Sequence, residues 1–413
     1  MKWSILLILV FLAPTAQAEA GDWVFSVAGD MRRYVYYQDI HGWDQACQAM
    51  ATEGPGAFLV SPGDLDQQYT TNPGNYVYQI IEEELGAGFP FFPGIGNHEL
   101  DDMDTTEWIR GFDHGGPTYA VNPGPPGSDN TTYSWDHDDA HFVMLNECFD
   151  GVSDIGSREG NWNAVLDSWL EADLTANTLP LVFVFGHFPA FPQVDRDTGL
   201  ALHHDDTDFN MFDNGAYRDA LWSILSAHGV TAYVCGHSHT SSVVQIDGVW
   251  QIDFGHARGP RDPNWHGPST FMRFVIGAEQ SVTLETWRQP FTDTIGGEAP
   301  YTKWHTDILR AASASAADEL PASAHLGAAW PNPFNPQTSI SWQQPEVGHA
   351  SITIYNLLGR RISSLVESTY STGSHSITWG GQDDRGRNQP AGTYLVKLQV
   401  GKTSDVIKLV LAR

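Results

Sequence analysis

The sequence predicts an α/β domain built on layered sheets, followed by a small all-β sandwich. From Trp23 to about Trp287, short apolar runs alternate with amphipathic stretches, which is typical of strands and helices packed in layers. After residue 325 the composition changes to Ser, Thr, Gly and Asn, with strand-like alternation. The two patterns divide the chain into a larger domain and a smaller one.

The chain begins with the features of a secretory signal peptide over residues 1–18. Lys2 is positively charged, the apolar run Ile5–Ala13 follows, and Ala16–Ala18 is a cleavage site of small residues. The run is shorter than the roughly 20 residues that span a bilayer. We therefore expect an exported protein without a transmembrane span.

The larger domain is expected over residues 19–305, with buried strands separated by helices. The expected strands are Trp23–Ala28, Ala57–Ser61, Phe89–Phe92, Phe142–Asn146, Leu181–Phe185 and Ala232–Cys235. The expected helices are Trp43–Thr52, Asn75–Leu85, Trp162–Leu174 and Ala216–His228. Beyond Ser242 the strands follow one another directly, which suggests a second sheet packed on the first.

Residues 306–325 are expected to be a linker, because Ala311–Ala324 is small, polar and without strand periodicity. Residues 326–413 are then expected to form the β-sandwich. Its expected strands are Ser339–Trp342, Ser351–Tyr355, His375–Trp379, Thr393–Val400 and Val406–Leu411. This domain carries no cluster of polar groups that indicates catalysis.

The charge balance limits the partners that the chain can bind. Acidic residues number 50 against 21 basic ones, for a net charge of -29. Nucleic acid is not expected as a partner, since the chain lacks the basic face that neutralises phosphates. A phosphate ester would also be repelled unless metal ions or a few arginines supplied local positive charge.

The chain has 3 cysteines, too few for a disulfide framework. A Cys47–Cys148 bridge stays open in an exported protein. Cys235 ends an apolar run and is expected to be a buried thiol.

Five segments share one pattern, in which an apolar strand is followed by a tight glycine turn and then by a metal-ligand type of side chain. They are Val27–Asp30, Val60–Asp64, Gly94–Glu99, Phe185–His187 and Cys235–His239. The carboxyl ends of strands in an α/β sheet meet at one edge, and glycine allows the sharp turn that follows. Carboxylate and amide oxygens mixed with imidazole suit two divalent or trivalent ions, which together can clamp a phosphate.

These segments resemble the calcineurin-like metallophosphoesterase superfamily, which includes purple acid phosphatases, nucleotidases and phosphodiesterases. The resemblance spans roughly residues 22–290 and rests on the order Gly-Asp, Gly-Asp, Gly-Asn-His-Glu, Gly-His and Gly-His-Ser-His. It implies a layered α/β/β/α sandwich of two mixed sheets. It also implies a metal-dependent phosphoesterase that acts on phosphate mono- or diesters.

The resemblance implies a role for each matching residue. Asp64 would bridge two ions of the Mn, Zn or Fe type. Asn97, His187 and His237 would complete one site. Asp30 and His239 would serve the other. His98 would orient the phosphate or protonate the leaving group while a metal-bound hydroxide attacks phosphorus.

One position departs from the family pattern. The first motif is commonly Asp-x-His with a ligand histidine, but here it is Asp30-Met31-Arg32, and arginine cannot bind a cation. Either Arg32 binds phosphate oxygens, or the first metal site is weak and one ion is held tightly. A surface binding protein that keeps the fold without efficient turnover is the alternative function. His256 and Arg258 follow another strand end and are further candidates for substrate contact.

The C-terminal segment begins with Trp330–Pro336, of sequence WPNPFNP, and continues with NLLGR, WGGQD and AGTY segments. Over about residues 326–413 it resembles the sorting domain of type IX secretion and the related immunoglobulin-like module of flagellar hook-capping proteins. The resemblance implies that secretion machinery delivers the protein across an outer membrane to the cell surface or the medium. An ordinary β-sandwich that packs on the enzyme or binds another molecule is the alternative.

Overall fold

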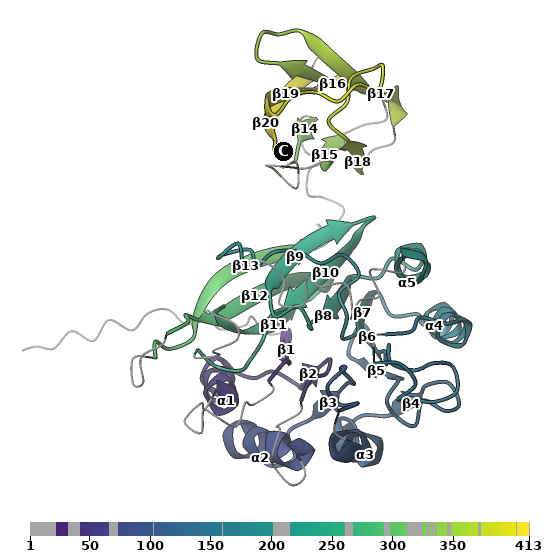
Figure 1. Cartoon of the computed structure of the whole chain (residues 1–413), viewed down its shortest axis with the longest axis vertical. Helices are drawn as coiled ribbons and strands as arrows, with labels where there is room; N and C mark the ends of the chain where they lie inside the picture. The colour runs from purple at the N-terminus through teal and green to yellow at the C-terminus, as the bar shows by residue number, and fades with distance from the viewer. Residues whose placement is uncertain are drawn as a thin grey trace, which may run out of the picture. The chain divides into compact units, whose positions relative to one another are not determined.

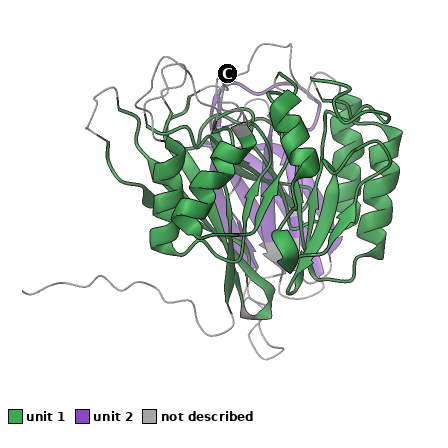
Figure 2. Cartoon of the chain, turned by 90° about the horizontal axis from the view of Figure 1, so that it is seen from below, with its two compact units in different colours: residues 1–313 green, residues 314–413 purple. Residues whose placement is uncertain are grey.

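The computed structural model describes the chain in two compact units, residues 1–313 and 314–413, which are coloured separately in Figure 2. The described residues are 22–31, 42–65, 73–101, 103–158, 160–200, 215–260, 267–292, 298–311, 324–327, 329, 332, 334, 337–344, 348–370, 373–401 and 403–412.

One mixed sheet of the first unit has 6 strands in the order β13-β12-β11-β1-β2-β3. Its strands are β1 (Trp23–Val27), β2 (Leu59–Ser61), β3 (Phe91–Pro93), β11 (Ser269–Gly277), β12 (Ser281–Gln289) and β13 (Thr302–Arg310). β1, β2 and β3 run parallel, whereas β11, β12 and β13 join antiparallel. The carboxyl ends of the three parallel strands therefore lie at one edge.

The other mixed sheet has 7 strands in the order β4-β5-β6-β7-β8-β10-β9. Its strands are β4 (Val121–Pro123), β5 (Tyr133–His137), β6 (Ala140–Met144), β7 (Leu181–Phe185), β8 (Ala232–Cys235), β9 (Ser241–Ile246) and β10 (Val249–Phe254). β6, β7, β8 and β10 run parallel. This sheet too presents several strand ends at one edge.

Helices cover the outer faces of the two sheets (Figure 1). They are α1 (Gly42–Glu53), α2 (Pro73–Leu85), α3 (Met103–Gly111), α4 (Ala164–Ala176) and α5 (Gly215–Ala227), with short 3-10 turns at Gly116–Thr118 and Ala278–Gln280. The start of α4 shows why a helix begins where it does. The Asn163 side chain accepts hydrogen bonds from the backbone N–H groups of Val165 and Leu166, which satisfies two donors of the first turn.

The core between the sheets is rich in aromatic side chains. Phe25 of one sheet stacks on Phe274 with ring centroids 4.6 Å apart, and it meets Phe142 of the other sheet edge to face at 5.2 Å. Two neighbouring residues of β3 belong to different clusters. Phe91 lies in the cluster that contacts the helices, and Phe92 lies in the cluster between the sheets. Because both faces of these strands are covered, they are continuous apolar runs. The expected α/β fold with two mixed sheets is confirmed.

The division of strands between the sheets differs from the expectation. The late strands do not form a sheet of their own, because β9 and β10 join β8 while β11, β12 and β13 extend the sheet of β1. Strand pairing depends on contacts between distant segments, which periodicity does not encode. The elements α3, β4, β5, β13, β14 (His325–Leu326) and β17 (Arg361–Tyr370) are likewise not among those expected.

The assignment of residues 306–310 to the linker is wrong, since β13 continues to Arg310 and pairs with β12. β13 is an edge strand whose side chains are largely exposed, and Ile308 is 68% exposed. It therefore lacks the buried apolar alternation that reveals a strand in a sequence.

The second unit is all-β and has its own core. Its strands are β14 (His325–Leu326), β15 (Thr338–Gln344), β16 (Gly348–Asn356), β17 (Arg361–Tyr370), β18 (Gly373–Trp379), β19 (Gly392–Val400) and β20 (Thr403–Leu411). They form sheets of 3 and 4 strands, ordered β14-β15-β18 and β17-β16-β19-β20. Trp342, Ile352 and Val396 lie in one buried cluster, as the expected immunoglobulin-like sandwich requires.

Cys47, Cys148 and Cys235 are all free and buried, so the structure does not form the Cys47–Cys148 bridge. Burial raises the pKa of each thiol, which keeps all three protonated.

Within the described part of the chain, no helix combines the length and the apolar character needed to cross a membrane.

Candidate metal centre

Strand ends from both sheets bring the expected ligands together. Asp30, Asp64 and Asn97 follow β1, β2 and β3 of the first sheet. His187 follows β7 of the second sheet, and His237 and His239 follow β8. All six side chains are buried. Residues from five separate loops thus form one cluster.

The atoms of His187, His237 and Asn97 face one another. Asn97 Oδ1 lies 3.1 Å from His187 Nε2 and 3.0 Å from His237 Nδ1, and these two nitrogens are 3.3 Å apart. Asp64 Oδ1 lies 3.5 Å from His187 Nε2. Two ligand atoms that bind one ion at about 2.1 Å, at about a right angle, lie roughly 3 Å apart. The four side chains therefore fit a single cation.

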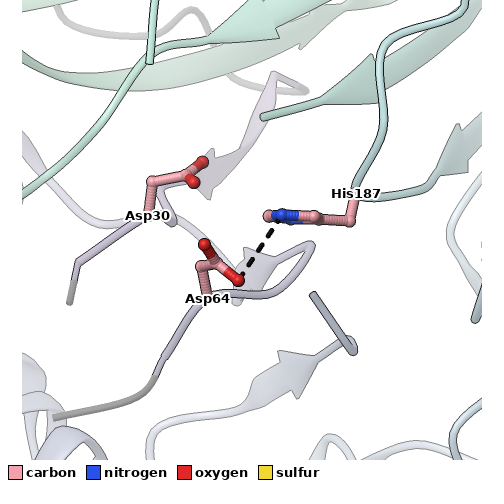
Figure 3. Close-up of side chains that lie close together, drawn as sticks. All are labelled: Asp30, Asp64 and His187. Atoms are coloured by element: carbon pink, nitrogen blue, oxygen red, sulfur yellow. Dashed lines mark ion pairs between the residues drawn. The ribbon is translucent and has the colours of Figure 1, made fainter. Parts of the chain in front are cut away.

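Asp30 and His239 form the other side of the cluster. Asp30 Oδ1 is 3.4 Å from His239 Nε2, and Asp30 Oδ2 accepts a hydrogen bond from the His237 backbone N–H at 3.0 Å. Ligand atoms of Asp30, Asp64 and His187 all lie within 4.8 Å of one another. Figure 3 shows these three side chains pointing toward one another, with the Asp64–His187 ion pair dashed. Asp64 lies between the two sides, where a bridging ligand belongs.

The backbone at four of these residues is left-handed. The φ angles are 49° at Asp30, 57° at Asp64, 66° at His237 and 58° at His239. This conformation is costly for residues other than glycine and tends to be found at functional sites. Four of the six proposed ligands therefore lie in a backbone conformation that is typical of functional sites.

Glycines allow the loops to approach one another closely. A Cβ atom on Gly96 would lie 2.3 Å from Asp64 Oδ1, and one on Gly236 would lie 2.2 Å from Asp30 Oδ2. A Cβ on Gly63 would meet the backbone nitrogen of Gly96 at 2.3 Å. The glycines of the motif therefore make space for the neighbouring ligand as well as permitting a turn.

Glu99 holds two of the loops together. Its Oε2 accepts hydrogen bonds from the backbone N–H groups of Asp64 at 2.9 Å and Gly96 at 2.6 Å, and its Oε1 accepts one from Leu65 at 2.8 Å. Glu99 is part of the Gly-Asn-His-Glu segment, but the sequence alone indicates no role for it. Two of these partners, the N–H groups of Asp64 and Leu65, are backbone groups of another loop, and such contacts leave no pattern in the sequence.

Two further buried carboxyl groups lie behind the ligands and were not identified from the sequence. Glu147 accepts hydrogen bonds from Tyr233 Oη at 2.7 Å and from the Phe188 backbone N–H at 2.7 Å, next to His187. Burial raises the pKa of Glu147 to about 7. Asp253 accepts a short hydrogen bond from the Ser238 hydroxyl, between the two histidines after β8, and burial raises its pKa. Both are isolated acidic residues without a local motif.

The electrostatics of the cluster favour the ligand forms of its central groups. Burial acts to raise the pKa of Asp64, but His187, His98 and His237 outweigh it and lower that pKa well below its ordinary value. Burial lowers the pKa of His187 and keeps the ring neutral. Burial and the neighbouring Asp64 raise the pKa of Asp30. An ionised carboxylate and a neutral imidazole are the forms that bind metal ions.

His98 is 8% exposed, more than any of the six proposed ligands. Its Nε2 is 3.9 Å from Asp64 Oδ2, and its Nδ1 is 2.8 Å from Asp101 Oδ2. Arg158 donates to the same Asp101 carboxylate with two nitrogens, from Nη2 to Oδ2 at 2.9 Å and from Nη1 to Oδ1. The three side chains form a line that fixes the orientation of the His98 ring.

Arg32 lies outside the described residues, so its expected contact with phosphate stays a prediction. Arg258, by contrast, is buried at the centre: its Nε donates to the backbone oxygen of Asp30 at 3.2 Å. His256 is buried beside it, with its ring centroid 5.9 Å from that of His239. Both residues that follow β10 thus lie against the cluster.

Two sheets sandwiched by helices, with Asp, Asn and His side chains at the strand ends, define a protein of the metallophosphoesterase type. Residues 21–241 match the family model described as calcineurin-like phosphoesterase, and residues 328–404 match the FlgD Ig-like domain. The chain belongs to the calcineurin-like phosphoesterase family.

Curated relatives match part of the chain. It is 30% identical over 120 residues to tartrate-resistant acid phosphatase type 5 of Rattus norvegicus, which is 28% of this chain and 32% of that protein. The enzyme of the same name from Homo sapiens is 29% identical over 120 residues, with the same shares covered. The chain therefore spans about a third of the length of these relatives.

Solved structures resemble the chain at low identity. Purple acid phosphatase PPD1 from yellow lupin is 13% identical with a TM-score of 0.46, covering 70% of this chain and 54% of that one. GAP50, the anchor in the inner membrane complex of Plasmodium, is 14% identical with a TM-score of 0.44, covering 70% and 89%. FlgD from P. aeruginosa is 22% identical with a TM-score of 0.15, covering 18% and 57%.

Proposed function

We propose that this chain is an exported, metal-dependent phosphoesterase that hydrolyses phosphate mono- or diesters. The observation that carries the proposal is the convergence of six buried ligand-type side chains from five strand ends of two sheets. Membership of the calcineurin-like phosphoesterase family supports it.

Each side of the cluster has a distinct role in this proposal. Asp64, Asn97, His187 and His237 would hold one ion, and Asp30 and His239 would serve a second position next to it. Bound ions of the Mn, Zn or Fe type polarise phosphoryl oxygens and make a water molecule more acidic. The protein contributes the fixed positions of the ligands, set by the left-handed turns and by Glu99.

His98 would act on the ester itself. Asp101 holds the ring through Nδ1 at 2.8 Å, which directs Nε2 toward the Asp64 side of the cluster. From there Nε2 can donate a hydrogen bond to a phosphate oxygen or a proton to the leaving oxygen. His98 is thus the proposed catalytic group that the chain itself provides.

A metal-addition assay tests the enzymatic part of the proposal. The purified protein is dialysed against a chelator and assayed on p-nitrophenyl phosphate and bis(p-nitrophenyl) phosphate, before and after Mn, Zn or Fe is restored. We expect hydrolysis of at least one ester to return with metal. Bound metal without hydrolysis of either ester would instead indicate a binding protein that retains the fold.

Variants of the centre test the roles of individual residues in this assay. Asp64→Ala and His98→Ala should each lower kcat by about 100-fold or more, since one removes a central ligand and the other the proposed proton donor. Asp219→Ala is the matched control, because this carboxylate is 68% exposed on α5 and pairs with the adjacent Arg218. Near-normal turnover in either centre variant would contradict the assignment.

Export is proposed from residues 1–18, and delivery to the cell surface or the medium from the C-terminal unit. The match of residues 328–404 to the FlgD Ig-like domain supports the second unit as a separate module. Cell fractionation tests both parts. Removal of residues 1–18 should leave the protein in the cytoplasm, whereas removal of residues 314–413 should stop it short of the surface. Unchanged surface delivery without residues 314–413 would contradict the sorting role.

A further inference from the structure

Arg258 is held firmly against one side of the metal centre. It follows β10, which runs parallel to β8, so its loop lies beside the loop of His237 and His239. The side chain is only 6% exposed. Its loop is tied to the rest of the centre, because the Ala257 backbone N–H donates to the Gly29 oxygen at 3.0 Å.

The contact of Arg258 with His239 defines the state of that histidine. Arg258 Nη2 lies 2.9 Å from His239 Nε2. A guanidinium group can only donate hydrogen bonds, so His239 Nε2 must be the acceptor. The lone pair of this nitrogen is therefore directed at Arg258.

The same lone pair is the one that a metal ion on this side of the centre would need. His239 Nε2 is the atom that faces Asp30 Oδ1, at 3.4 Å. An unprotonated imidazole nitrogen has one in-plane lone pair and cannot serve a cation and a guanidinium N–H at once. Repulsion between the two positive charges adds to this competition in a buried site.

The other side of the centre is arranged differently. There the ligand atoms of Asn97, His187 and His237 lie within 3.0–3.3 Å of one another and share a common focus. Asp64 Oδ1 lies 3.5 Å from His187 Nε2 and so borders the same group of ligand atoms. The two sides thus differ in what their ligand atoms are directed at.

We propose that the centre holds one tightly bound ion, on Asp64, Asn97, His187 and His237, and that the guanidinium of Arg258 occupies the Asp30–His239 side. The inference rests on the proposed phosphoesterase function. Arg258 compensates the charge of Asp30 and offers N–H groups to a phosphate oxygen, a task for which arginine geometry is suited. A second ion then binds only when Arg258 moves aside.

Ion counting tests this directly. The full chain is freed of metal and equilibrated with increasing Mn²⁺, followed by elemental analysis and electron paramagnetic resonance. The wild type should bind one Mn²⁺ tightly, with the spectrum of an isolated ion. In Arg258→Met the second Mn²⁺ should bind at least about tenfold more tightly than in the wild type, because its competitor is gone. The spectrum should then show coupling between ions about 3.5–4 Å apart.

Arg273→Met is the matched control, because Arg273 pairs with Glu285 at 2.7 Å within the same unit but outside the centre. This variant should bind the same number of Mn²⁺ ions as the wild type, with the same affinities. Two ions of equal affinity in the wild type would overturn the inference, even if Arg258→Met failed to fold. An affinity of the second site that is the same in Arg258→Met and the wild type would also overturn it. Binding of no ion at all would overturn the phosphoesterase proposal as well.

Discussion

Asp101 is the residue that orients His98. It accepts from His98 Nδ1 at 2.8 Å while Arg158 holds both of its oxygens. A carboxylate in this position accepts the Nδ1 proton, stabilises the doubly protonated ring whose Nε2–H can be donated to the ester, and keeps Nε2 directed at the centre. Asp101 follows the Gly-Asn-His-Glu segment, where the sequence alone favours a solvated loop.

We expect Asp101→Asn to lower kcat by about 10- to 100-fold, as is usual when a group behind a functional histidine is lost. KM and the number of bound ions should stay close to the wild type, because Asp101 is not among the proposed ligands. Steady-state kinetics with elemental analysis checks this. A loss of metal together with activity would show that Asp101 supports the centre as a whole.

We expect His114 to make the stability of the fold depend on pH. It is buried, its ring stacks on Tyr133 with centroids 4.1 Å apart, and its Nε2 is 2.8 Å from the Asn130 backbone oxygen. Burial lowers its pKa from 6.5 to about 4, although the hydrogen bond to Asn130 and the nearby Asp113 act in the opposite direction. The folded state therefore resists protonation more than the unfolded state does.

The free energy of unfolding should fall as the pH drops from about 6.5 to about 4, because the unfolded chain takes up this proton first. The loss should reach roughly 2 to 3 kcal/mol near pH 4.5. His114→Gln keeps a donor for Asn130 but removes the titrating group. Urea titrations at about pH 7 and pH 4.5 should therefore show a smaller loss in the variant. Equal losses in both proteins would rule out His114 as the source.

At the scale of elements, the loops that follow the strands approach one another closely. Four of the proposed ligands have left-handed backbones, and the glycines beside them leave room for side chains of neighbouring loops. The turn after each strand and the contact between loops are two separate requirements. The first is local and visible in the sequence, whereas the second depends on which loops meet.

Gly96→Ala should disrupt the loop contact without changing the turn. Its Cβ would lie 2.3 Å from Asp64 Oδ1 and 2.9 Å from His187 Cε1, so both ligands would have to shift. We expect metal affinity to fall at least about tenfold. Gly111→Ala at the end of α3 is the control, since no atom lies within 4 Å of its Cβ position. Metal titration of both variants measures this affinity. A wild-type metal affinity in Gly96→Ala would show that the close approach of Gly96 to Asp64 and His187 is not required.

At the scale of the whole molecule, the two units have independent cores. The clusters of the first unit end at Leu309, and the cluster of the second draws only on residues from Ala324 to Leu411. All proposed ligands belong to residues 1–313. The centre is therefore complete within one unit.

Removal of residues 314–413 should leave a folded protein whose kcat/KM is within about twofold of the full chain, since no core residue of the first unit is lost. Thermal unfolding and the phosphoester assay measure this. Aggregation or loss of activity would show that the first unit depends on the second.

Much of the fold and all six proposed metal ligands could be predicted from the sequence. Strands such as β7 and β8, and the turns that place Asp30, Asp64 and His237, follow from local patterns of apolar residues, glycines and polar residues. Local patterns determine which segments become strands and what type of side chain follows each strand.

Only the tertiary structure decided which strands share a sheet and which side chains meet at its edge. β11 pairs with β1, and Arg258 contacts His239, through contacts between segments far apart in the chain. Glu147 and Asp253 lie behind the ligands for the same reason, as isolated residues that burial brings to the centre. The physical reason is that contacts between distant segments depend on complementary shape and on matching hydrogen-bond partners. Neither property produces a periodic pattern in the sequence.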